Sequence, residues 1–133
     1  MGAGSQTRKE RHPRMFIEQY EYTVNLGMGD QWERFMLDQA VPYQRGRGMR
    51  IMGLFWADDE HTRFIWMRAF TNDEERERLY TAVYDSDDWQ QNYLPEVRRL
   101  VVKGSSRTTR LDPMGESSMY SEEMPADQMV REA

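Results

Sequence analysis

Alternating apolar and polar positions mark the first strand of the chain. Residues 15–24 read MFIEQYEYTV, and strand geometry places every second side chain on one face. β-branched and aromatic residues dominate this run, as is typical of strands. The shared face carries Phe16, Glu18, Tyr20, Tyr22 and Val24.

Three further strands follow from similar patterns. Residues 49–57 (MRIMGLFWA) are apolar almost throughout and predict a strand buried on both faces. Residues 63–70 (RFIWMRAF) predict the next strand, and the short polar link at 58–61 joins the two as a hairpin. Residues 101–111 (VVKGSSRTTRL) predict a fourth strand.

Helical periodicity begins after the first strand. Asp30 is the expected N-cap, with Glu33 at capping-box spacing. Pro42 lies inside this stretch and predicts a kink or the end of its regular part. The apolar side of the helix recurs about every 3.6 residues and carries Trp32, Phe35, Met36, Gln39, Ala40 and Tyr43.

A second helical region follows the third strand. Asn72 is its expected N-cap, with Glu75 at the third helical position; its apolar side carries Leu79, Tyr80, Val83 and Tyr84. Another helical stretch begins at Ser86, and Pro95 predicts a bend or a restart within it. The apolar face of that stretch carries Trp89, Tyr93, Val97 and Leu100.

The order of these elements predicts the fold. A β-α-β-β-α-β order is typical of the α+β, ferredoxin-like arrangement, a four-stranded antiparallel sheet whose first and third strands are central neighbours. The helices then cover one face of the sheet only. An uncovered apolar face in water is an aggregation hazard, so the pattern favours a homodimer with sheet packed against sheet.

Composition sets the limits of the folded domain. Only 38% of the 133 residues are apolar, and the mean hydropathy is -0.92. We expect a basic, flexible arm at residues 1–14, a folded domain at 15–112, and an acidic, Met-rich tail at 113–133 that is disordered or docked on the partner. Such polar ends bury too little surface to offset the entropy of ordering.

Charge and residue usage exclude several classes of function. A net charge of -5 argues against nucleic acid as the main partner, and no apolar run is long enough to span a membrane. The chain has no cysteine and two distant histidines, so no zinc site with ordinary ligand spacing can be built. We therefore expect no metal and no cofactor, and the lack of cysteine fits a cytoplasmic location.

Two motifs in the predicted hairpin carry a family resemblance. The first is Gly-Met-Arg-x-x-Gly at residues 48–53, and the second is Phe-x-Trp-x-Arg-x-Phe at residues 64–70. In this order and spacing they resemble the bacterial NIPSNAP-like proteins of the dimeric α/β-barrel superfamily. The resemblance implies two ferredoxin-like subunits forming a barrel, with a ligand-sized cavity in each. The family's first strand usually carries an arginine where this chain has Tyr20, so a role of that arginine in binding anions does not carry over.

The central strands hold the candidate site. Tyr20, Tyr22 and Arg68 are the predicted catalytic residues, because phenol and guanidinium groups can transfer protons and hold a developing negative charge. The predicted substrate-binding residues are aromatic: Trp66, Trp56, Trp32, Phe64 and Trp89. The alternative is that Glu18 neutralises Arg68 and that this face packs at the dimer interface.

Two functions remain open at this point. The first is a cofactor-independent enzyme that oxygenates, cyclises or isomerises an aromatic or polyketide-like metabolite of secondary metabolism, activities found among relatives on the same fold. The alternative is a dimer that binds a small molecule or a protein partner without catalysis. Fold alone does not separate them.

Overall fold

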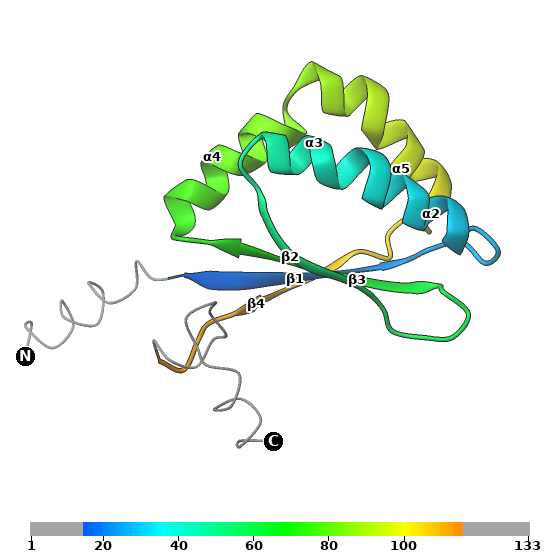
Figure 1. Ribbon diagram of the computed structural model, residues 1–133, viewed down its shortest axis with the longest axis horizontal. Helices are drawn as coiled ribbons and strands as arrows, with labels where there is room; N and C mark the ends of the chain where they lie inside the picture. The colour runs from blue at the N-terminus through cyan, green and yellow to red at the C-terminus, as the bar shows by residue number, and fades with distance from the viewer. Residues whose placement is uncertain (1–14, 116–133) are drawn as a thin grey trace, which may run out of the picture.

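A four-stranded antiparallel sheet forms the base of the molecule (Figure 1). The computed structural model describes residues 15–115, so the predictions for residues 1–14 and for 116–133 of the expected tail lie outside the described residues. The strands are β1 (Phe16–Thr23), β2 (Arg50–Trp56), β3 (Arg63–Phe70) and β4 (Arg107–Leu111), in the spatial order β2-β3-β1-β4. The predicted pairing of the first and third strands is confirmed.

Two helical segments form a layer on the same side of this sheet (Figure 1). The first comprises α2 (Gly29–Phe35), the π-helix η1 (Met36–Ala40) and α3 (Val41–Gly46). The second comprises α4 (Asp73–Tyr84), the π-helix η2 (Trp89–Tyr93) and α5 (Leu94–Leu100). The order and the layers define the ferredoxin-like α+β fold that the sequence predicts. Among residues 15–115, no helix has the length and apolar character needed to cross a membrane.

The ends of the elements depart from prediction in two places. β4 is shorter than expected, and Val101 forms only an isolated bridge with Val24. Asp30 is not a cap: α2 begins after Met28, whose carbonyl accepts the Trp32 N–H at 2.9 Å. The main chain turns at Gly27, with φ +84°, and this turn starts the helix early enough to leave Asp30 in its first turn.

The second cap is confirmed, because the Asn72 side chain accepts the Glu75 N–H at 2.8 Å. This hydrogen bond satisfies one of the free N–H groups at the start of α4. It fixes the rotation of the helix and therefore the direction of the tyrosines on its sheet-facing side.

Pro42 and Pro95 each follow a π-helical turn. The Val41 N–H donates to the Met36 carbonyl, and the Leu94 N–H donates to the Trp89 carbonyl, five residues back in each case. Pro42 and Pro95 then stand in the first turn of the following α-helix, where their missing N–H costs nothing.

The extra residue in the first π-turn rotates the apolar face of the helix. Beyond Met36 the buried positions are Ala40, Val41 and Gln44, whereas Gln39 is exposed and Tyr43 is half-buried. A regular helix would keep Gln39 and Tyr43 on the buried side. The π-turn thus brings a polar residue, Gln44, into the core.

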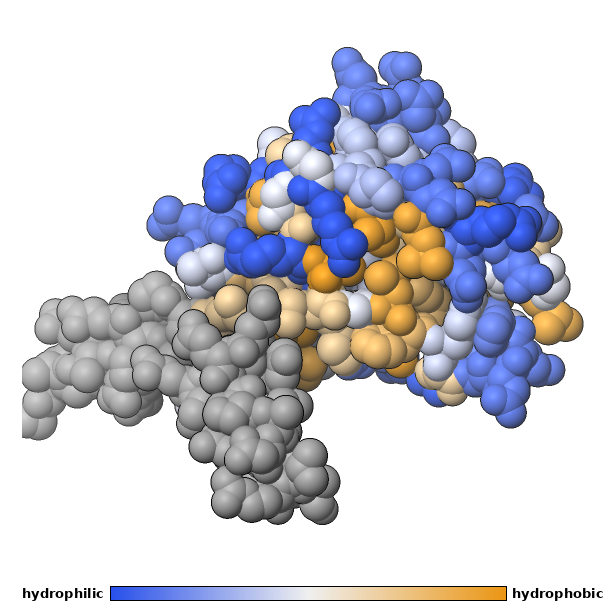
Figure 2. Space-filling view, viewed as in Figure 1, coloured by the Kyte–Doolittle hydropathy of each residue, from blue (hydrophilic) through white to orange (hydrophobic). Residues whose placement is uncertain are grey.

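The two faces of the sheet differ in burial. The helix-covered face packs into the core, whose side chains include Phe16, Val24, Phe64, Trp66, Phe70, Val83 and Leu100. β2 is not buried on both faces within the chain, because the helices cover one side only: Met52 and Phe55 remain 52% and 51% exposed. Figure 2 shows apolar side chains gathered between the helices and the sheet, with hydrophilic side chains over the helices.

Candidate ligand-binding site

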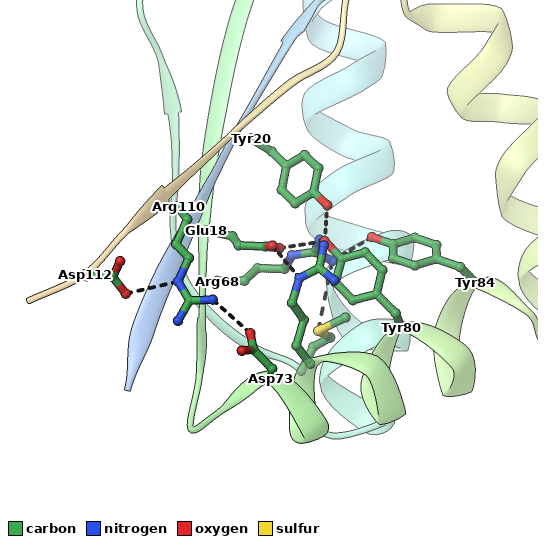
Figure 3. A network of polar contacts seen from close by, with 10 residues as sticks. Glu18, Tyr20, Arg68, Asp73, Tyr80, Tyr84, Arg110 and Asp112 are labelled. Carbon is green, nitrogen blue, oxygen red and sulfur yellow. Dashed lines mark hydrogen bonds and ion pairs between the residues drawn. The ribbon is translucent and has the colours of Figure 1, made fainter. Parts of the chain in front are cut away.

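Arg68 lies on the helix-covered face of the sheet and is fully buried. Its guanidinium donates to the hydroxyls of Tyr84 and Tyr80 at 2.6 and 2.9 Å (Figure 3). It also donates to the Gln44 Oε1 at 3.0 Å. α4 supplies both tyrosines, whose i, i+4 spacing stacks them on one helix face. The helices of the same chain therefore cover this face, and the interpretation of it as the dimer interface is wrong.

Aromatic rings enclose the guanidinium as well. Its central carbon lies 4.6 Å from the ring centroids of both Tyr20 and Trp66. Ring faces carry partial negative charge and attract a cation, more strongly away from water. The side chain of Arg68 is thus held by hydroxyls and rings, and no carboxylate touches it in the described part of the chain.

Glu18 faces Arg68 across β1 and β3 but does not pair with it. The two are register partners, yet the Glu18 carboxylate accepts the Tyr80 hydroxyl at 2.6 Å and forms a salt bridge with Arg76. The expected neutralisation of Arg68 by Glu18 is therefore wrong as a direct contact. Arg76, on α4, reaches the carboxylate, and the Tyr80 hydroxyl stands between the two strand residues. Tyr20 completes this series of hydrogen bonds through its contact with the Tyr80 hydroxyl.

Burial keeps the tyrosines of this layer neutral. Burial raises the pKa of Tyr84, and the nearby charge of Arg68 offsets this increase only in part. Burial also raises the pKa of Tyr22 well above the ordinary tyrosine value. Burial also raises the pKa of Tyr80, although Arg68 lies beside it. At neutral pH these hydroxyls therefore donate hydrogen bonds and do not act as bases.

An inner cavity of about 110 Å³ lies next to this network. The two π-helices help to form it, because η1 supplies Met36 and η2 supplies Trp89. π-helical turns occur frequently at functional sites. The wall is mostly aromatic and consists of Tyr22, Trp32, Met36, Gln44, Trp66, Tyr84, Trp89, Leu94 and Val97.

Two side chains in this wall have unpaired donors. The indole N–H groups of Trp32 and Trp66 are buried and have no hydrogen-bond partner in the described part of the chain. Leaving a buried donor unpaired costs about 1–3 kcal/mol, and native proteins have few such groups. An oxygen acceptor bound beside these indoles would recover that free energy.

A larger pocket adjoins the inner cavity. Its volume is about 490 Å³, within the usual size range of ligand sites. Tyr22 and Val97 line both spaces, so these side chains lie between the two. The rest of the pocket wall comes from α5 and the loop before β4: Arg98, Val101, Val102, Lys103, Gly104 and Ser106.

The structure brings together half of the predicted site residues. Tyr22, Trp66, Trp32 and Trp89 line the inner cavity. Tyr20 and Arg68 lie behind its wall and are absent from the lining of both spaces.

The remaining two predicted residues lie elsewhere. Trp56 and Phe64 line a separate cavity of about 100 Å³ on the β2 side, which shares Trp32 with the inner cavity. The Trp56 indole donates to Glu33 at 2.8 Å, so its N–H already has a partner.

Sequence reasoning missed the polar residues that complete the site. Gln44 becomes visible only if the π-turn is known, because a regular helix would turn it away from the sheet. The sequence pattern places Tyr84 on the apolar side of a helix and indicates no polar role for it. Arg98 and Lys103 belong to no motif. The sequence pattern that could have identified them is a pair of cationic residues beside an apolar stripe, next to the Gly104 turn.

Comparison with known proteins bears on the fold. The sequence matches no protein-family model and no curated protein. Among solved structures, a NIPSNAP-like domain protein from Burkholderia xenovorans is similar with a TM-score of 0.69 at 20% identity, over 80% of this chain and 90% of that one. A NIPSNAP family protein of unknown function from Agrobacterium tumefaciens has a TM-score of 0.69 at 19% identity, over 80% and 94%.

A third structure is described by an activity. It is a variant of SnoaB, a cofactor-independent oxygenase from Streptomyces nogalater, with a TM-score of 0.56 at 14% identity, over 77% of this chain and 96% of that one. The chain thus has a ferredoxin-like α+β fold. Within that class it shares the fold of NIPSNAP-family proteins, as the hairpin motifs predicted.

Proposed function

We propose that this protein binds a planar, mostly apolar metabolite in the outer pocket and the inner cavity. The observation that carries the proposal is the pair of unpaired indole N–H groups, on Trp32 and Trp66, in the wall of the inner cavity. Aromatic walls favour a flat ligand, and the two donors favour a carbonyl or phenolate oxygen at its inner end. The 110 Å³ of the inner cavity suits a small substituent, since an apolar cavity of about 150 Å³ holds benzene.

The same groups suit stabilisation of a negative oxygen. The neutral Tyr22 hydroxyl and the two indoles are donors, and Arg68 places a positive charge behind them. Donors preorganised around a developing oxyanion lower the barrier to its formation. Tyr22 lines both spaces and would touch the substrate, so it is the proposed catalytic donor. Arg68 and Tyr20 are proposed to position Tyr84, Tyr80 and the cavity wall.

We propose further that the bound metabolite is aromatic or polyketide-like and that the protein transforms it without a cofactor. The structural similarity to SnoaB, a cofactor-independent oxygenase, supports oxygenation as the candidate reaction. With anthrone as a probe, the ring methylene would become a carbonyl, one O₂ would be consumed and one water released. Oxygen uptake that requires Tyr22 would support this reaction; its absence with bound anthrone would favour the second candidate.

The second candidate is binding without catalysis. One observation favours it: among the described residues that line the two spaces, none is a carboxylate or a histidine. A base would then have to come from the ligand itself or from solvent. Cyclisation and isomerisation need such a base as much as oxygenation does.

The experiment that tests ligand binding compares two probes of equal shape. Acetonaphthone has a carbonyl that ethylnaphthalene lacks, and tryptophan fluorescence reports the binding of both. We expect the ketone to bind about tenfold more tightly, because one hydrogen bond to a buried donor is worth about 1.4 kcal/mol. Trp66→Phe and Trp32→Phe remove the donors and should reduce that preference.

Trp56→Phe is the matched control, because its indole N–H is already bonded to Glu33. It should leave the preference for the ketone unchanged. The binding proposal is wrong if neither probe binds, or if the three variants have the same effect.

We also propose that the open sheet face pairs with a second copy of the chain. Phe55 is half-exposed there, and its ring lies so close to Gly53 that a side chain at Gly53 would collide with it. Phe55→Glu should convert the dimer to a monomer in sedimentation velocity. Leu26→Glu is the control, because Leu26 is 75% exposed and does not line the cavity that Phe55 lines. A monomeric native protein would refute the pairing.

A further inference from the structure

The mouth of the outer pocket carries positive charge in an acidic protein. Arg98 and Lys103 line the pocket, and no carboxylate does among the described residues. The whole chain has a net charge of -5. A local concentration of cations against the overall charge attracts anions to that site.

Neither cation is neutralised by a neighbour. Arg98 and Lys103 take part in no salt bridge within residues 15–115. The adjacent Arg99 contrasts with them, because it donates to Glu96 at 2.9 Å and to Gln31 at 2.9 Å. The neutralised arginine thus lies beside the pocket, and the free one lines it.

The loop that presents Lys103 is anchored to the sheet. The Val102 N–H donates to the Thr23 carbonyl at 2.8 Å, and the Ser105 hydroxyl accepts the Thr23 N–H at 3.1 Å. Gly104 has φ +79°, a conformation that side chains disfavour. These contacts hold the lysine at the mouth before a ligand arrives, which reduces the entropy lost on binding.

The pocket is therefore polar at its mouth and apolar along its length. Of these two spaces, Arg98 and Lys103 line only the outer pocket, the unpaired indoles line only the inner cavity, and Tyr22 and Val97 line both. Each end offers hydrogen-bond donors, but only the mouth offers charge directly to a ligand.

We infer that the ligand is an amphipathic organic acid with a planar body. Its carboxylate lies at the mouth between Arg98 and Lys103, its apolar body passes Tyr22 and Val97, and an uncharged oxygen acceptor reaches the inner cavity. This inference rests on the proposed function and adds the chemical class of the ligand. It excludes neutral hydrocarbons and organic cations as good ligands.

The test uses one acid and its primary amide. Acetylnaphthoate carries a carboxylate on one ring and an acetyl group on the other, and the amide differs only in charge. By calorimetry, we expect the acid to bind the native protein about tenfold more tightly than the amide. The double variant Arg98→Gln, Lys103→Gln should abolish this preference, because the affinity for the acid falls to that for the amide.

A matched variant controls for the change in net charge. Arg78 is an exposed arginine on α4, away from the pocket, and its contact with Glu75 is long at 3.9 Å. The single variant Arg78→Gln removes the same charge as the single variant Arg98→Gln. It should leave the preference for the acid intact.

The outcomes separate this inference from the proposed function. Equal binding of acid and amide, both weakened by Trp66→Phe, overturns the acid inference and keeps the cavity as the site. A preference for the acid that survives the double variant places the carboxylate elsewhere and also overturns the inference. If neither probe binds, the inference and the proposed function both fail.

Discussion

Two polar regions lie between the sheet and the helices, and their hydrogen bonding differs. Around Arg68, the two terminal guanidinium nitrogens, the hydroxyls of Tyr80 and Tyr84, the Gln44 amide and the Glu18 carboxylate form hydrogen bonds. The Nε–H of Arg68 is the one side-chain donor there without a partner among the described residues. In the neighbouring cavity wall, the indole donors of Trp32 and Trp66 have no partner within the described chain.

The difference separates structural groups from groups available to a ligand. A network in which nearly all polar groups bond to one another contributes to stability and has little to offer a ligand. Unpaired donors beside a cavity reduce stability and gain their partner on binding. Changes in the Arg68 network should therefore reduce the free energy of unfolding, and changes at the two indoles should reduce affinity.

Removal of the buried guanidinium should have the largest effect. Arg68→Met leaves Gln44, Tyr80 and Tyr84 without their charged donor in a site closed to water. We expect the free energy of unfolding to fall by about 3 kcal/mol, measured by urea denaturation. A loss below about 1 kcal/mol would mean that the network contributes no more than a surface ion pair. That result would contradict the structural role of the Arg68 network.

Glu18→Gln should have the next largest effect. The buried carboxylate accepts from Arg76 and Tyr80, and hydrogen bonds to charged groups are worth about 1.5–3 kcal/mol. We expect a loss of about 2 kcal/mol in the same assay. Glu21→Gln is the control, because its salt bridge with Arg63 is partly exposed and should contribute less than about 1 kcal/mol.

Alkaline titration should distinguish the partly buried Tyr22, Tyr80 and Tyr84 from free tyrosine. The folded-state pKa values of Tyr22, Tyr80 and Tyr84 lie above the ordinary value of about 10. Their stabilising contribution is complete below about pH 10 and is lost as the pH rises through the folded-state values. Phenolate absorbance should show these three ionising only together with unfolding, and ionisation in the folded protein near pH 10 would contradict their burial.

The smallest expected effect concerns the attachment of α4, the helix that carries Tyr80 and Tyr84. Arg50 and Thr71 lower the pKa of Glu75 to about 2, chiefly through the hydrogen bond from Arg50. A carboxyl whose pKa is lowered in the folded state stabilises the fold at pH values above the ordinary carboxyl pKa. That contribution is lost as the pH falls toward 2. After allowance for solvent screening, Glu75→Gln should cost about 1 kcal/mol at pH 7 and nothing at low pH. Equal losses at both pH values would contradict this.

The sequence predicted the sheet well because strand patterns are local. Alternation placed Tyr20, Tyr22, Trp66 and Arg68 on one face, and the structure confirms that placement. The partners of Arg68 were not predictable in the same way. Gln44 reaches it only because a π-turn rotates the helix, and Glu18 is diverted by Arg76 from another element.

The candidate pocket was harder still to predict. Arg98 and Lys103 belong to no motif, and their importance comes from the absence of neighbouring carboxylates in space. Unpaired indoles leave no trace in a sequence, because pairing depends on every element packed around them. Tertiary packing, and not local pattern, defines this part of the molecule.

The most direct test of the central claim observes the four indole N–H groups of the chain by two-dimensional NMR, with each resonance assigned by a Trp→Phe variant. Titration with acetonaphthone should move the resonances of Trp32 and Trp66 in the direction of a new hydrogen bond. The resonance of Trp56, already bonded to Glu33, should stay in place. Binding of the ketone without movement of the Trp32 and Trp66 resonances would contradict the account.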